Sequence, residues 1–236
     1  MKHTLLTRWL AALAATLALA VPAAAQTLRI ASAFDPQTQD PHALALLYHS
    51  RVAYQVYESL VGRDAGFKLE PALATSWQQM DPKRWRFQLR PGVRFHDGST
   101  MSADDVVFSI TRALGKTSQR AFQLKGVTQA VKTGPLTVDL LLETPDAVLP
   151  EKLQYISIMS RAWSEQHGVT AAQDFNGKQE TFAVRNANGT GPFKLARYEP
   201  DVVTVLQRHD GWWGQADARN GNLAEVRFVV IKSDAT

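Results

Sequence analysis

Cysteine is absent from the 236 residues of this chain. Its absence excludes disulfides, thiolate nucleophiles and cysteine-ligated zinc. The sequence also has no phosphate-binding loop, no glycine fingerprint for dinucleotides and no serine nucleophile elbow. Long apolar runs are missing too, because the apolar segment Leu10–Val21 is shorter than the about 20 residues that a membrane span needs.

Strong charge of either sign is also lacking. The formal net charge is +4. Lys2 and Arg8 belong to a segment that we expect to be removed, and taking these two cations from +4 leaves +2. This charge is too small and too scattered for a nucleic-acid footprint, so we expect no nucleic-acid partner.

The first 25 residues have the pattern of a secretory signal peptide. Lys2 and Arg8 supply the positive start, Leu10–Val21 is the apolar middle, and Ala23–Ala25 is a small-residue cleavage site before Gln26. A buried helix is the alternative, and the flanking charges and the cleavage site disfavour it. We therefore predict a periplasmic protein with a cleaved signal peptide. It is not lipid-anchored, because no cysteine follows the cleavage site.

The clearest structural pattern runs from Trp85 to Leu114. Trp85–Leu89 alternates apolar and polar residues, which predicts a strand with Trp85 facing a core. Pro91-Gly92 is a turn signal, and Val93–Phe95 resumes the alternation, which predicts a second strand.

A capped helix follows in the same stretch. Ser102 is a good N-cap, and Asp105 three residues later has capping-box spacing. Apolar residues then recur at helical spacing as far as Leu114, and Gly115 can stop the helix.

The same rules predict further elements along the chain. They are a strand at Leu28–Ser32, a helix from about Ser50 to Gly62, a turn or short helix at Ala72–Trp77, a hairpin of Val127–Lys132 and Leu136–Glu143, a helix within Pro145–Leu153, a helix from Ser160 to Gly168, a hairpin of Phe193–Tyr198 and Val202–Arg208, a strand at Leu223–Ile231 and a helix cap at Ser233-Asp234.

Several residue pairs resemble chemical sites but have simpler interpretations. His96-Asp97 precedes a glycine, so a turn is favoured over half of a catalytic pair. His42 and His49 have no third ligand at a recognised spacing, so we predict no metal site. Trp212 and Trp213 are adjacent, so one of them is expected to be exposed or wedged at a domain seam. We predict no catalytic residues and no cofactor.

Several motifs together resemble one protein family. They are the signal peptide, Leu60-Val61, Leu69–Trp77, Trp85–Leu114 and Asn188–Trp213, which contains Gly189-Thr190-Gly191-Pro192-Phe193. In this order the motifs resemble the extracellular solute-binding proteins of family 5, the peptide/nickel-type binding proteins of ABC importers. Family members are considerably longer, so the resemblance implies a chain that stops before the second lobe.

The resemblance implies an α/β fold. It would be a periplasmic-binding-protein type II-like lobe with a mixed sheet, plus an extra α+β subdomain of hairpins and helices. Residues 26–60 and 181–236 would form the lobe-one core with the hinge-side sheet, and residues 61–180 the family-specific subdomain. The second lobe would be absent.

The resemblance also implies a function. The protein would capture a peptide-like solute and deliver it to ABC permease subunits that work with cytoplasmic ATPases, and at full length it would be a monomer. Binding residues would be Ala45, Leu47 and Tyr48, after the Asp-Pro-His turn, together with Phe122 and Tyr155. The alternatives are a secreted hydrolase and a binding protein for another solute, such as an opine, a sugar or a metal chelate.

Overall fold

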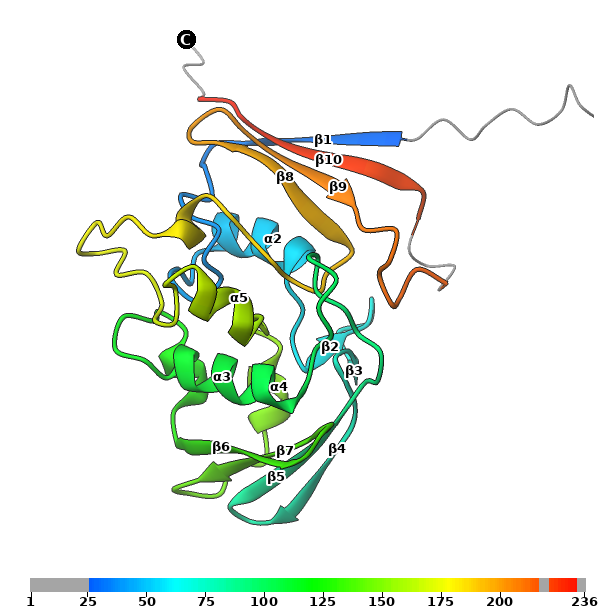
Figure 1. Cartoon of the computed structure of the whole chain (residues 1–236), viewed down its shortest axis with the longest axis vertical. Coiled ribbons are helices and arrows are strands. Elements are labelled where there is room, and N and C mark those ends of the chain that lie inside the picture. Colours follow the sequence, from blue (N-terminus) through cyan, green and yellow to red (C-terminus); the bar gives the residue numbers. More distant parts are fainter. Residues whose placement is uncertain (1–25, 217–220, 233–236) are drawn as a thin grey trace, which may run out of the picture.

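Two four-stranded sheets with helices between them make up most of the fold (Figure 1). The computed structural model describes residues 26–216 and 221–232. The predicted signal peptide, residues 1–25, and the cap predicted at residues 233–234 lie outside this part of the chain. No helix of the described residues is long and apolar enough to cross a membrane.

The first sheet combines strands from both ends of the described chain. Its order is β1 (Gln26–Ser32), β10 (Leu223–Val230), β9 (Val203–Arg208) and β8 (Phe193–Glu199). β1 runs parallel to β10 and the other pairs are antiparallel, so the sheet is mixed, as predicted. Helix α2 (Leu47–Val56) packs against β8, and Val52 and Val56 share a core with Leu206, Val226 and Phe228.

The second sheet and a small hairpin are built from the middle of the chain. The sheet has the order β4 (Ala74–Asp81), β5 (Arg84–Leu89), β7 (Thr137–Leu142) and β6 (Val127–Gly134), and the hairpin is β2 (Val61–Arg63) with β3 (Leu69–Pro71). Helix α3 (Ala103–Ala113) packs on β6 and β7. Phe87, Val138 and Leu140 are fully buried between them, so this is the larger core.

Helix α3 begins as the sequence predicts. The Ser102 hydroxyl accepts a hydrogen bond from the backbone N–H of Asp104 at 3.2 Å. The Asp105 carboxylate in turn accepts one from the backbone N–H of Ser102 at 2.8 Å, which completes the capping box.

The remaining helices are short. They are η1 (Ala121–Leu124), α4 (Leu149–Leu153), α5 (Arg161–Gln166) and η2 (Phe182–Val184). Ser160 caps α5 as predicted, accepting from the N–H of Trp163 at 3.2 Å. The helix predicted within Pro145–Leu153 is only partly right, because it begins at Leu149. The two predicted hairpins, β6 with β7 and β8 with β9, are confirmed.

The prediction of a turn or helix at Ala72–Trp77 is wrong. This segment begins β4, which pairs antiparallel with β5 along its length and places Trp77 opposite Phe87. The prediction paired Trp85–Leu89 with the chain that follows it, whereas its hairpin partner is the chain that precedes it, and this pairing makes residues 74–77 extended.

The predicted second strand at Val93–Phe95 is also wrong. The segment makes only an isolated bridge between Arg94 and Thr100. Val93 and Phe95 are nevertheless buried, which explains their alternation. Strand β5 pairs with β4 on one side and β7 on the other, so it has no free edge for another strand.

Helix α2 starts and ends earlier than predicted. It ends at Val56, and Tyr57 is already extended, with φ −114° and ψ 149°. The backbone N–H of Gly191 donates to the carbonyl of Val56 at 2.9 Å. A distant loop therefore takes the carbonyl that would have continued the helix, and residues beyond it form β2.

Trp85 is half-buried rather than fully inside the core. Its indole packs against the larger core and donates a hydrogen bond to the carbonyl of Asp146 at 2.9 Å. The fully buried aromatic side chain of this strand is Phe87. The alternation thus identified the buried face of the strand but overstated the burial of its first residue.

Candidate functional site

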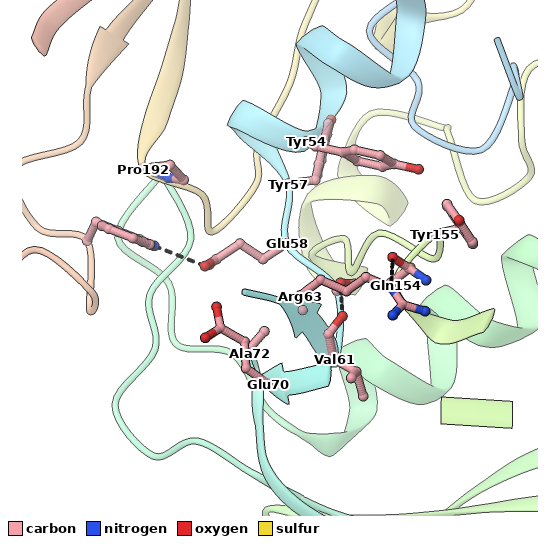
Figure 2. Close-up of a pocket in the computed structure, with 13 residues that line it drawn as sticks. Tyr54, Tyr57, Glu58, Val61, Arg63, Glu70, Ala72, Gln154, Tyr155 and Pro192 are labelled. Carbon is pink, nitrogen blue, oxygen red and sulfur yellow. Dashed lines mark hydrogen bonds between the residues drawn. The ribbon is translucent and has the colours of Figure 1, made fainter. Parts of the chain in front are cut away.

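A cavity of about 430 Å³ opens at the C-terminal end of α2 (Figure 2). The end of α2 contributes Tyr54 and Tyr57, and the chain that follows contributes Glu58. The β2–β3 hairpin, the segment at Tyr155 and the loops holding Pro192 and Trp212 complete the wall. Residues as far apart in sequence as Tyr54 and Trp212 thus line one cavity.

Glu58 is the central charged group of this cavity. One carboxylate oxygen accepts from the indole of Trp212 at 3.1 Å and the other from the indole of Trp213 at 2.9 Å. Burial raises the pKa of Glu58 to about 7, although the hydrogen bonds from Trp213 and Trp212 act against this rise. The guanidinium carbon of Arg90 lies 3.9 Å from the ring centre of Trp213, on the face of the indole. Glu58 therefore fixes the loop after β9 to the end of α2.

The opposite side of the cavity is held by Arg63 of the β2–β3 hairpin. Its Nε donates to the side-chain oxygen of Gln154 at 2.9 Å, and its guanidinium lies 3.3 Å from the carboxylate of Glu151. A further bond runs from Arg63 to the carbonyl of Phe67. These bonds tie the hairpin to α4, so the wall beside Tyr155 is held by side chains from both elements.

A buried ion pair holds the loop that precedes α2. The Asp40 carboxylate accepts from the two terminal nitrogens of Arg112 at 2.8 and 2.6 Å, and both side chains are fully buried. Burial alone would raise the pKa of Asp40, but the charge and hydrogen bonds of Arg112 outweigh it and lower the pKa to about 2. Asp40 also accepts from the backbone N–H of Gln173 at 2.9 Å. The loop is thereby fixed to α3 and to the segment after α5.

The two histidines of this loop are part of the scaffold. His42 Nε2 donates to the carbonyl of Ser157 at 2.9 Å, so its Nδ1 is free to accept from Arg112 at 3.1 Å. His49 Nε2 donates to the carbonyl of Asp40 at 3.0 Å. Burial lowers the pKa of His42 to about 3 and that of His49 to about 4, so both rings are neutral near pH 7. Over residues 26–216 and 221–232, no three His, Asp or Glu side chains gather as a metal site would require.

His96-Asp97 stands in a turn, and His96 touches the glycine-rich loop. The Asp97 carboxylate accepts from the backbone N–H of Ser99 at 2.9 Å, the bond expected of an aspartate turn. His96 Nε2 donates to the carbonyl of Gly191 at 3.0 Å, and Asn188 donates to Asp97 at 2.7 Å. The pair joins the turn to the loop that ends α2.

The structure links Ala45 and Phe122 through one polar segment. The backbone N–H of Ala45 donates to the side-chain oxygen of Gln119 at 3.2 Å. Gln119 precedes Arg120, which donates to Ser50 on α2 at 2.6 Å, and Phe122 follows in η1. Phe122 is 66% exposed, so the fold presents its ring to the surface.

Leu47 and Tyr48 have different surroundings although both lie in the first turn of α2. Leu47 is 77% exposed. Tyr48 packs its ring against Phe34, with ring centres 5.4 Å apart, and its hydroxyl accepts from Gln37 at 3.3 Å. Tyr48 is thus already engaged by the loop before it, whereas Leu47 is available for contact.

Of the five predicted binding residues, only Tyr155 lines the cavity at Glu58. It is 40% exposed and stands across the cavity from Glu58, on the side of Tyr54 (Figure 2). Ala45, Leu47 and Phe122 lie outside its lining. Gln119 and Arg120, just before Phe122, bind Ala45 and Ser50, and the Arg120 guanidinium lies 5.9 Å from the ring centre of Tyr54. We call this side of α2, from Leu47 to Tyr54 with Phe122 and Tyr155, the face along α2.

Sequence reasoning missed the charged centre of the cavity. Glu58 stands between apolar pairs, Val56-Tyr57 and Leu60-Val61, and such an isolated acid is a weak signal of a buried partner. Trp212 and Trp213 were expected to separate, one of them exposed or at a seam. Both are half-buried, and together they hold one carboxylate.

Comparison with protein families finds one match. The family described as "Bacterial extracellular solute-binding proteins, family 5 Middle" matches residues 68–236. This range covers all of the larger core except Leu60 and Val61, together with the Glu58-binding tryptophans and the last strand, but starts after α2.

Two curated relatives have similar sequences. The uncharacterized protein YhjP of Bacillus subtilis is 31% identical over 176 residues, which are 74% of this chain and 27% of that protein. The HTH-type transcriptional regulator SgrR of Salmonella choleraesuis is 31% identical over 167 residues, 68% of this chain and 26% of that protein. The chain thus spans about a quarter of the length of these relatives.

Solved structures share the fold. The periplasmic binding protein DppA from Helicobacter pylori, in complex with the peptide STSA, is 25% identical with a TM-score of 0.75, over 89% of this chain and 43% of that one. AppA from Bacillus subtilis, in complex with a nonapeptide, has 21% identity and a TM-score of 0.75, over 88% and 40% of the two chains. MoaA from A. tumefaciens R10, in complex with mannopinic acid, has 23% identity and a TM-score of 0.75, over 90% and 42%.

Proposed function

The chain belongs to the family 5 bacterial extracellular solute-binding proteins, and we propose that it forms the first lobe of a periplasmic receptor for a peptide-like solute. The receptor would deliver the solute to ABC permease subunits driven by cytoplasmic ATPases, and would be a monomer at full length. The family matches are binding proteins rather than enzymes.

One observation carries the peptide assignment. The face that runs along α2 exposes the apolar side chains Leu47 (77%), Phe122 (66%) and Tyr155 (40%). Apolar side chains exposed together are typical of ligand-binding or partner-binding surfaces. Apolar groups with few charges suit the side chains and extended backbone of a peptide better than a sugar. The peptide complexes of the structural neighbours DppA and AppA support the same class.

A two-lobed arrangement accounts for the openness of this face. In such receptors a ligand is enclosed between lobes that move about a hinge. We propose residues 26–60 and 181–236 as the lobe-one core and residues 61–180 as the extra subdomain. The strand membership supports this division, since one sheet is built from residues 26–32 and 193–230 and the other strands fall within residues 61–142.

An opine is the second candidate. MoaA, which is bound to mannopinic acid, matches the fold as well as the peptide-binding neighbours do, with the same TM-score of 0.75. The secreted hydrolase has less support, because both oxygens of the half-buried carboxylate of Glu58 accept hydrogen bonds from indole N–H groups.

The first test is a thermal-stability screen of the full-length protein. A mixed peptide pool, an opine panel, a sugar panel and nickel are added separately, since a ligand that binds only the folded state raises the melting temperature. The proposal expects a rise with peptides alone. A rise with opines or sugars alone would contradict the peptide assignment and leave a binding protein of another class.

The second test concerns location. A regulator that resembles SgrR acts where DNA is, whereas a receptor of an importer acts outside the inner membrane. The sequence of residues 1–25 supports export. Cell fractionation should recover a protein that begins at Gln26 in the periplasm. A cytoplasmic protein that retains Met1 would contradict export and favour the regulator.

A further inference from the structure

Arg120 is a buried cation without a buried anion. The residue is 3% exposed and lies at the start of η1, between α3 and Phe122. One terminal nitrogen donates to the Ser50 hydroxyl at 2.6 Å, and Nε has no hydrogen-bond partner. No carboxylate within residues 26–216 and 221–232 lies within ion-pair distance of Arg120.

Arg112 is a buried arginine with a structural role, and it provides a comparison for Arg120. It is also 3% exposed, but it has two bonds to the Asp40 carboxylate and two to backbone carbonyls, those of Val169 and Ala171. A buried charge is costly unless it is paired and fully hydrogen-bonded. Arg112 meets both conditions, whereas Arg120 meets neither.

A second orphaned polar atom lies beside Arg120. The guanidinium carbon of Arg120 is 5.9 Å from the ring centre of Tyr54, whose hydroxyl is near enough to favour the charge of Arg120 but is buried without a hydrogen bond of normal geometry. Buried polar atoms in native proteins are almost always satisfied, so two neighbouring exceptions call for a common explanation. One group satisfies both, since a carboxylate can accept from the guanidinium N–H and from the phenol O–H at once.

The position of this pair connects it to the candidate site. Tyr54 and Tyr155 line the cavity on the side opposite Glu58 (Figure 2). Tyr155 lies close enough to influence the charge of Arg120. Gln119 and Phe122, on either side of Arg120, belong to the exposed face along α2. Arg120 does not line the cavity itself, so its guanidinium lies behind Tyr54, on the side of the cavity away from Glu58.

We propose that Arg120, together with the hydroxyl of Tyr54, receives a carboxylate of the bound solute and so makes the receptor selective for anionic ligands. The inference rests on the proposed function, because it assumes that the face along α2 binds a solute. The burial that lowers the pKa of Arg120 is offset when the carboxylate arrives. The positive charge of Arg120 thus contributes to ligand specificity and not to the stability of the protein without ligand.

The test compares the full-length wild type with Arg120→Met and with the control Arg185→Met. Arg185 is an exposed arginine 3.8 Å from Glu180, so its replacement changes the net charge equally without touching the cavity lining. The probes are two pools of random tripeptides without Asp or Glu, one with free C-terminal carboxylates and one with C-terminal amides. Calorimetry measures the dissociation constant of each pool.

Wild type and Arg185→Met should bind the acid pool at least about tenfold more tightly than the amide pool, as a charge-assisted bond of about 1.4 kcal/mol or more implies. Arg120→Met should bind the two pools alike. An unchanged preference in Arg120→Met, or equal binding of both pools by the wild type, would overturn the assignment while the peptide receptor stands.

If neither pool binds, the peptide assignment is overturned, and a second probe then tests Arg120 by itself. Succinate and chloride are then compared at equal ionic strength. The Arg120 assignment expects succinate to raise the melting temperature of the wild type and of Arg185→Met but not that of Arg120→Met. Equal shifts in all three proteins would overturn it.

Stability without ligand gives an independent result. Replacing an unpaired buried cation with an apolar side chain of similar length is neutral or stabilising. Arg120→Met should therefore melt at the wild-type temperature or above it. A large fall in melting temperature would show instead that Arg120 supports the scaffold.

Discussion

The carboxylate of Asp40 and the guanidinium of Arg112, 72 residues apart in the sequence, form two hydrogen bonds of 2.8 and 2.6 Å at complete burial. The pair joins the loop before α2 to α3 and, through Gln173, to the segment after α5. It therefore positions Ala45 and the start of α2, from which the candidate binding face extends.

Asp40→Asn should cost about 3–5 kcal/mol of unfolding free energy, because it leaves the charge of Arg112 buried without its partner. The denaturant midpoint measures this loss. Glu165→Gln is the control, since it removes the partner of Arg161 in an exposed pair and should cost about 0–1 kcal/mol. Equal losses in the two variants would show that the buried pair does not hold the loop.

The capped strand-and-helix stretch gives a ranked series of stabilities. Phe87→Ala should cost about 3–5 kcal/mol, because this ring is fully buried in the larger core. Ser102→Ala should cost about 1 kcal/mol through the loss of its cap. Trp85→Ala should fall between them, since its indole is only half-buried. Chemical denaturation ranks the three, and a Trp85 variant as damaging as Phe87→Ala would contradict the burial described here.

Gly189 lies against the end of α2, where no side chain fits. A Cβ at this position would be 1.9 Å from the carbonyl oxygen of Val56. Gly189→Ala should thus destabilise the protein by about 1–3 kcal/mol, as overpacked sites do. Gly62→Ala is the matched control, with its nearest atoms at 3.7 Å, and should stay within about 0.5 kcal/mol of wild type. A neutral Gly189→Ala would mean that the loop does not terminate α2.

Glu58 should make stability depend on pH near neutrality. Its pKa is raised from 4.5 to about 7, so between these values the folded protein holds a proton that the unfolded chain releases. Stability contributed by this group therefore falls as pH rises from 4.5 to 7 and is level outside that window. Glu58→Gln has no proton to lose, so its unfolding free energy relative to wild type should increase across the window.

Denaturation of both proteins at pH 5, 6, 7 and 8 measures that difference directly. Glu165→Gln is again the control, because it makes the same substitution in an exposed ion pair outside the cavity. Parallel profiles for wild type and Glu58→Gln would mean that Glu58 is ionised throughout, as an ordinary surface glutamate is.

The sequence predicts most of this fold where local signals decide it. The capping box at Ser102 and Asp105 and the β6–β7 and β8–β9 hairpins depend on residues close together in the chain, and all of them are confirmed. Prediction was wrong where distant partners decide. Helix α2 ends where the distant Gly191 binds the carbonyl of Val56. Ala72–Trp77 is a different case, because its partner β5 is near in the chain but was assigned to a hairpin with the segment after it.

The candidate site follows the same rule. The order of the family motifs is enough to propose an aromatic residue such as Phe122 or Tyr155 for ligand contact. Such a residue needs only to be exposed, and this does not depend on a partner elsewhere in the chain. The bonds from Glu58 to Trp212 and Trp213 span 154 and 155 residues, so no local pattern announces them. The lack of a carboxylate beside Arg120 is equally invisible in the sequence, since it is a property of the packed structure.

The central claim is that the face along α2, ending at Tyr155, binds the solute. Its most direct test is calorimetry of the full-length protein with the peptide pool, comparing wild type with Phe122→Ala, Tyr155→Ala and the control Phe182→Ala. Phe182 is an aromatic residue of similar exposure to Tyr155, 42% against 40%, but it stacks on His167 away from this face. Losing an aromatic contact of about 1.5–3 kcal/mol should weaken binding at least about tenfold in Phe122→Ala and Tyr155→Ala, with Phe182→Ala unchanged. Equal affinity in all four proteins would contradict the claim.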